Sequence, residues 1–264
     1  MRLVDAKARC ILPACLIAFA FVTFAPGATA PARADDATFV VATNFKAVIA
    51  ELEKMFEADS EHDVTITTGS TGKLYAQIKN GAPFDAFLAA DQRRPMLLEE
   101  EGDIVPGSRF TYAVGQIVLW SPDPERIGGD GVEVLEDGDF NFVAIANPEL
   151  APYGLAAQQV MQHYGLWEAL SPKIVMGENI GQAFSMTATG NAELGFVALS
   201  SVLAPGNQQE GSWWDAPDEA HAPIRQDAVL LKRGADNEAA KAFLDFIRSD
   251  EAAEVIKSFG YAVE

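Results

Sequence analysis

The chain has 264 residues and a formal net charge of −19 at pH 7, with 38 acidic residues against 19 basic ones. This balance argues against nucleic acid or an anionic membrane surface as a partner. Its only cysteines, Cys10 and Cys15, lie near the start, so a disulfide scaffold, a thiolate nucleophile and a cysteine metal site are excluded from the rest of the chain.

Residues 1–34 are predicted to be a signal peptide. Basic residues near the start precede an apolar run over residues 11–24 that is too short for a comfortable membrane span, and Ala32-Arg33-Ala34 offers a small-x-small cleavage site. Most of this apolar run follows Cys15, whereas a lipoprotein signal would place it before the cysteine, so a lipid anchor is not expected. Cleavage after Ala34 would leave a periplasmic protein of about 230 residues, enough for two lobes.

After the leader, short β-branched runs alternate with amphipathic stretches. This alternation predicts an α/β fold with mainly parallel sheets. The expected strands are residues 39–42, 64–67, 87–89, 114–120, 142–146, 173–176, 194–198 and 228–232. Residues 237–257 are expected to form two helices that end before Gly260. The loop over residues 206–223 contains Trp213-Trp214, for which loop packing is favoured over an aromatic ligand box.

Two extended runs, residues 110–120 and 224–231, are predicted to connect two α/β lobes as a two-strand hinge. Domain 1 would comprise residues 35–114 and 226–264, and domain 2 would comprise residues 115–225. Ligands of such proteins bind between the lobes.

Four strand-to-helix junctions carry hydrogen-bond donors at the helix start, where unpaired N–H groups and the positive end of the helix dipole face outward. The first lobe has Thr43-Asn44 and Gly69-Ser70-Thr71-Gly72, and the second has residues 147–154 and 177–182. Any one of them could be an ordinary capped turn. Two from each lobe would converge in a cleft, because ligands of α/β sheets bind at the carboxyl ends of the strands.

The sequence resembles the periplasmic molybdate-binding proteins of ABC importers over essentially the whole mature chain. The motifs that carry the resemblance are ATNF (42–45), GSTGKLYAQIKNGAPFDAFLAAD (69–91), ANPELAPYG (146–154), GENIGQAF (177–184), NAELGFVALS (191–200) and PIRQDAVLL (223–231). The resemblance implies a two-lobed class II binding-protein fold and one tetrahedral oxyanion in the cleft, molybdate or tungstate. It also implies an ABC permease with its ATPase as partners, for a protein expected to be a monomer.

By position, the resemblance implies ligand donors on both lobes, among them hydroxyls, one amide NH₂ and backbone N–H groups. They are Thr43, Asn44, Thr71 (with Ser70 as a possible stand-in), Tyr153 and the backbone N–H of Ile180. Some relatives have a tyrosine ligand where this chain has Ala198, so the phenol of Tyr153 is expected to reach the ligand from another direction. Replacing Thr71 by alanine is expected to weaken binding and leave the fold intact.

A site made only of donors suits a dianion that carries no proton, because every oxygen of such an ion only accepts hydrogen bonds. No enzyme, metal site or cofactor is expected, since the three histidines are scattered without ligand spacing. The alternative is a binding protein for another anion, such as sulfate or a small organic carboxylate. A carboxylate would call for an arginine fork, for which Arg109 and Arg225 are the candidates.

Overall fold

The computed structural model describes residues 35–207 and 211–264, which belong to one compact unit, Ala34–Glu264. The predicted signal peptide and both cysteines lie outside the described residues. Within that part of the chain, no helix combines the length and the apolar character needed to cross a bilayer.

The first of two five-stranded sheets has the strand order β2-β1-β3-β10-β4. Its strands are β1 (Asp36–Ala42), β2 (Asp63–Gly69), β3 (Ala86–Leu88), β4 (Phe110–Gly115) and β10 (Ile224–Leu230). The first three strands pair in parallel, whereas β10 runs antiparallel to both of its neighbours.

The second sheet has the order β7-β6-β8-β5-β9. Its strands are β5 (Ile117–Ser121), β6 (Val143–Ala146), β7 (Ile174–Gly177), β8 (Leu194–Ala198) and β9 (Ser212–Asp215). Strands β6, β7 and β8 are parallel, while β5 runs antiparallel to β8 and β9.

The two-lobed α/β fold predicted from the sequence is confirmed, although both sheets are mixed and not mainly parallel. The antiparallel strands include the two runs predicted to connect the lobes. The first run is split at Gln116, with β4 in one sheet and β5 in the other. The Trp213-Trp214 pair lies on the unpredicted strand β9, where Trp214 packs against the core. The domain boundaries at residues 114 and 225 stay a prediction.

Ten α-helices occur in the described residues. They are α1 (Lys46–Asp59), α2 (Thr71–Lys79), α3 (Arg93–Glu100), α4 (Gly131–Asp137), α5 (Pro152–His163), α6 (Trp167–Leu170), α7 (Ile180–Ala188), α8 (Leu199–Val202), α9 (Glu238–Ile247) and α10 (Asp250–Ser258). The last two confirm the helix pair predicted to end before Gly260. A 3₁₀ turn, η1 (Thr43–Phe45), connects β1 to α1.

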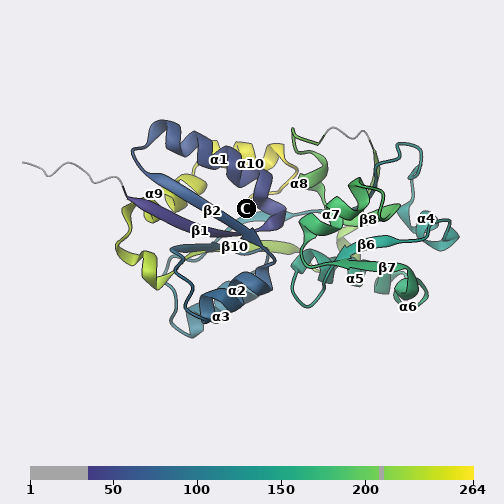
Figure 1. Cartoon of the computed structure of the whole chain (residues 1–264), viewed down its shortest axis with the longest axis horizontal. Coiled ribbons are helices and arrows are strands. Elements are labelled where there is room, and N and C mark those ends of the chain that lie inside the picture. Colours follow the sequence, from purple (N-terminus) through teal and green to yellow (C-terminus); the bar gives the residue numbers. More distant parts are fainter. Residues whose placement is uncertain (1–34, 208–210) are drawn as a thin grey trace, which may run out of the picture. The chain divides into compact units, whose positions relative to one another are not determined.

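Alternate side chains of the first sheet reach opposite faces, as the pleat requires. Phe39 and Val41 of β1 pack with α1, α9 and α10, whereas Val40 packs with Leu74 of α2 and Leu98 of α3. Figure 1 shows α1 and α10 along one face of this sheet and α2 and α3 along the other. The carboxyl ends of four parallel strands lead into helices. Strands β1 and β2 of the first sheet lead into η1 and α2, and strands β6 and β7 of the second sheet lead into α5 and α7.

Candidate anion-binding site

A small cavity lies where four of these strand ends meet. All five residues predicted as ligand donors line it: Thr43, Asn44, Thr71, Tyr153 and Ile180. Its empty volume is about 190 Å³ even with its open mouth included. A cavity of this size fits only a small ligand.

Three hydroxyl groups border the cavity. Thr43 Oγ1 and Ser70 Oγ are buried and have no hydrogen-bond partner among the described residues. Thr71 Oγ1 accepts the backbone N–H of Ala90 at 3.1 Å, which leaves its own proton available. An unsatisfied buried hydroxyl costs about 1–3 kcal/mol, so all three are suited to donate to a group inside the cavity.

Helix starts add backbone donors. Pro152 begins α5 and has no N–H, so Tyr153 carries the first N–H of that helix. At α7, the side chain of Asn179 accepts the N–H of Gln182 at 3.0 Å, and the side chain of Gln182 accepts the N–H of Glu178 at 2.6 Å. Neither bond uses the N–H of Ile180, the first residue of α7. An N–H at a helix start points out of the helix, and Ile180 lines the cavity, so this N–H is a further donor for a bound anion.

The side chain of Asn44 makes bonds that the sequence did not predict. Its Nδ2 donates to Gln226 Oε1 at 2.7 Å and to Tyr261 Oη at 3.0 Å. Both amide protons are therefore used within the protein. The NH₂ group expected to bind the ligand is thus already engaged, and the backbone N–H in η1 is the remaining donor of Asn44.

The phenol of Tyr153 is buried against the strands that connect the two sheets. Gln226 Nε2 donates to Tyr153 Oη at 3.4 Å. A Cβ atom at Gly115 would stand 1.9 Å from that oxygen, so only glycine leaves room for the phenol there. Burial, and then the neighbouring Tyr261, raises the pKa of Tyr153 well above its usual value, so the phenol keeps its proton.

Gln226 is the residue of this site that sequence reasoning missed. It is fully buried in β10, and its Oε1 accepts from both Asn44 and the hydroxyl of Tyr112, the latter at 3.1 Å. The polar pair Gln226-Asp227, directly before the apolar residues 228–231 of an expected strand, was the available signal, because buried polar side chains need partners.

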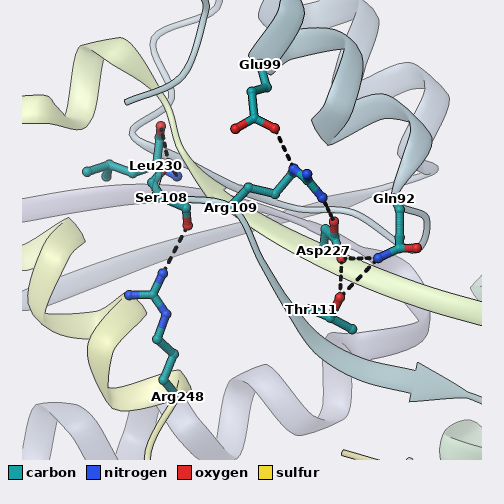
Figure 2. Close-up of polar contacts among 8 residues, drawn as sticks. All are labelled: Gln92, Glu99, Ser108, Arg109, Thr111, Asp227, Leu230 and Arg248. Carbon is teal, nitrogen blue, oxygen red and sulfur yellow. Dashed lines mark hydrogen bonds and ion pairs between the residues drawn. The ribbon is translucent and has the colours of Figure 1, made fainter. Parts of the chain in front are cut away.

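No charged side chain lines the cavity among the described residues. The two arginines considered as a carboxylate fork are engaged elsewhere. Arg109 bonds Glu99 at 2.7 Å and the fully buried Asp227 at 2.8 Å, as Figure 2 shows. Arg225 pairs with Glu264 at 2.9 Å. The described residues also contain no cluster of three or more side chains able to hold a metal ion.

A wider groove shares Thr43, Asn44 and Asn179 with the cavity and is lined also by Lys46, Thr68 and Gln182. The unpartnered hydroxyl of Ser70 lines the cavity and not this groove. Close contact with a small ion therefore falls to the smaller cavity.

Several known proteins resemble this chain over most of its length. A family model described as bacterial extracellular solute-binding protein matches residues 37–262. The chain is 49% identical over 233 residues to the molybdate-binding protein ModA of Azotobacter vinelandii, covering 88% of this chain and 92% of its relative. It is also 49% identical over 238 residues to the molybdate-binding protein ModA of Rhodobacter capsulatus, covering 90% and 92%.

Solved structures extend the comparison. The periplasmic molybdate-binding protein of Azotobacter vinelandii matches with a TM-score of 0.83 at 41% identity, covering 86% of this chain and 99% of that one. The sulfate-binding protein SubI from Mycobacterium tuberculosis matches with a TM-score of 0.72 at 12% identity, covering 87% of each chain, which shows a shared fold only.

Proposed function

The chain belongs to the family of bacterial extracellular solute-binding proteins, and from this premise we propose that it binds molybdate or tungstate for delivery to an ABC importer. One observation carries the choice of ligand. Two buried hydroxyls without partners, Thr43 Oγ1 and Ser70 Oγ, border a small cavity that no charged side chain lines among the described residues. The relatives at 49% identity are molybdate-binding proteins.

The chemistry of the ion matches these groups. Molybdate at neutral pH has four oxygens and no proton, so it needs donors and no acceptor. In our proposal six donors supply them: the hydroxyls of Thr43, Ser70 and Thr71, and the backbone N–H groups of Asn44, Tyr153 and Ile180. Each hydrogen bond to a charged group contributes about 1.5–3 kcal/mol. Six of them, less the costs of ordering and desolvation, reach the roughly −10 kcal/mol of a complex in the tens of nanomolar.

The same argument ranks competing anions. Phosphate carries a proton at neutral pH and needs a hydrogen-bond acceptor for it, which a site made only of donors does not offer. Sulfate has the charge and shape of molybdate and is smaller, so its bonds to a fixed cage are longer and weaker. A small organic carboxylate lacks its arginine partner, since Arg109 and Arg225 are paired with acids.

The remaining parts of the proposal concern the setting. The mature protein acts in the periplasm after cleavage behind Ala34, as a monomer without cofactor or catalytic activity, and meets an ABC permease and its ATPase. N-terminal sequencing of the exported protein tests the cleavage: Asp35 should be the first residue. A start at a lipid-modified Cys15 would overturn this part.

Isothermal titration calorimetry tests the ligand. Protein dialysed free of oxyanions is titrated with molybdate, tungstate, sulfate and phosphate in turn. We expect saturable binding with one site per chain for the first two and heats near the dilution background for the others. Tight sulfate binding with weak molybdate binding would replace the proposal with the sulfate alternative.

A further inference from the structure

Two backbone carbonyls in the loop between β6 and α5 are held by donors from the other sheet's helices. The N–H of Gly72, in the first turn of α2, donates to the carbonyl of Leu150 at 2.8 Å. Arg94 Nη2, from α3, donates to the carbonyl of Glu149 at 3.1 Å. The loop they hold leads directly into Pro152 and the cavity-lining start of α5.

Arg94 is oriented for this contact by its own turn. The carboxylate of Asp91 accepts the backbone N–H of Arg94 at 2.9 Å and also pairs with its guanidinium through Nη1. The Arg94 side chain is only 15% exposed. A guanidinium fixed in this way has little rotamer freedom left to lose when its second nitrogen meets Glu149, so the contact is worth more than that of a free surface arginine.

Gly72 makes the close approach possible. A Cβ atom there would stand 3.1 Å from the carbonyl oxygen of Leu150 and 3.0 Å from Arg94 Nη2. The neighbouring Thr71 borders the cavity. The Gly72 and Arg94 contacts therefore flank the site, with one lobe supplying the donors and the other the acceptors.

We propose that Arg94 is a clasp residue: it holds the loop before α5 against α2 and α3, and it slows the release of the bound oxyanion. It is a positioning residue, since it does not line the cavity. A contact that forms only when two elements meet stabilises the closed arrangement without affecting the open one, so its loss appears mainly in the dissociation rate. The inference rests on the proposed function for the ligand used to read it out.

Arg93 provides a matched control. It is adjacent in the sequence, exposed, and makes no hydrogen bond or ion pair in the described part of the chain. Arg93→Gln and Arg94→Gln remove the same charge from nearly the same place, so both change the long-range field alike. Arg94→Lys is the second test variant, because it keeps the charge but cannot bridge Asp91 and Glu149 as a planar fork does.

The assay follows release of ⁹⁹Mo-labelled molybdate after a chase with unlabelled molybdate. We expect Arg94→Gln to speed dissociation about 3- to 10-fold, the worth of one hydrogen bond at a partly exposed site, with an unchanged association rate. Arg94→Lys should also release molybdate faster than the parent protein, and Arg93→Gln should release it at the same rate as the parent protein. Equal dissociation rates for Arg93→Gln and Arg94→Gln would overturn the clasp.

A second measurement keeps the clasp and the proposed function apart. If the parent protein does not bind molybdate, the proposed function fails, and amide hydrogen exchange of Gly72 still decides the clasp. Its N–H bonds to Leu150, so its protection should fall in Arg94→Gln and persist in Arg93→Gln. Protection that is the same in both variants would reject the clasp.

Discussion

Replacing Ser70 by alanine should move stability and binding in opposite directions. Ser70 occupies the N-cap of α2, where losing a capping side chain usually costs about 1 kcal/mol. Here Ser70 Oγ makes no cap hydrogen bond and has no partner among the described residues. Its removal relieves the cost of an unsatisfied buried hydroxyl, about 1–3 kcal/mol. The free energy of unfolding of the ligand-free protein should therefore rise by about 1 kcal/mol.

Binding should weaken in the same variant. A hydrogen bond to a charged group contributes about 1.5–3 kcal/mol, so the dissociation constant for molybdate should rise about 10- to 100-fold. For a chain of this size, the stability gain corresponds to a melting temperature about 2–4 °C higher without ligand. Differential scanning calorimetry on oxyanion-free protein measures the first effect, and isothermal titration calorimetry measures the second.

Thr71→Ala is the matched comparison. Thr71 Oγ1 accepts the N–H of Ala90, so its loss leaves a buried backbone donor without a partner. Both the free energy of unfolding and the affinity for molybdate should fall in this variant, whereas the sequence alone predicted only the loss of affinity. A Ser70→Ala protein that melts earlier and binds molybdate as tightly as the parent would refute the reasoning, because its hydroxyl would then be satisfied within the protein.

Three further predictions concern ionisable groups. Burial raises the pKa of Tyr153 above its usual value near 10, so the contribution of Tyr153 to the stability of the ligand-free protein should be constant well below pH 10 and fall above it, where the unfolded chain loses a proton that the folded one keeps. Melting temperatures from about pH 8 to 11 should fall less steeply in Tyr153→Phe. Burial raises the pKa of Glu193, but hydrogen bonds from the N–H of Phe142 and from the Asn141 side chain outweigh it and bring the value to about 2. Glu193 should therefore stabilise the fold at neutral pH and lose this effect as the pH falls from 4.5 toward about 2, and an acid melting series on Glu193→Gln should be flatter there. The Lys73–Glu178 ion pair spans 2.7 Å but is largely exposed, so Lys73→Ala should change molybdate affinity by no more than about 2-fold, and not at all at high salt, in calorimetric titrations.

The sequence predicted the parts of the site that local rules govern. A strand end followed by small polar residues and then a helix predicts a donor-rich tip, and the residues at all four such tips line one cavity, including Thr43 and Ile180. Backbone N–H groups at a helix start point outward whatever the rest of the fold does. The two helices after residue 237 were also predictable from local sequence alone, since the spacing of their apolar residues sets the buried face.

The parts that were missed depend on pairs far apart in the chain. The Asn44 amide bonds Gln226 and Tyr261, which lie 182 and 217 residues further on, and no local pattern tells an amide whether to face the ligand or the interior. The mixed character of the sheets has the same origin. Strand β10 reads as an ordinary strand, and only its return between β3 and β4 makes it antiparallel to both.

A protein this acidic can hold a dianion because its charges are paired away from the cavity. Asp91 is paired with Arg94, the buried Asp227 with Arg109, and Glu178 with Lys73, so these three carboxylates near the site each face a cation. Charges beyond about 8–10 Å are screened at physiological salt, whereas hydroxyls and helix-start N–H groups act at contact distance. The local donors therefore decide whether the ion binds, and the net charge governs only how fast an anion approaches. The neutral lining suits this chemistry, because a carboxylate among the lining residues would repel the anion and a cation there would favour any anion alike.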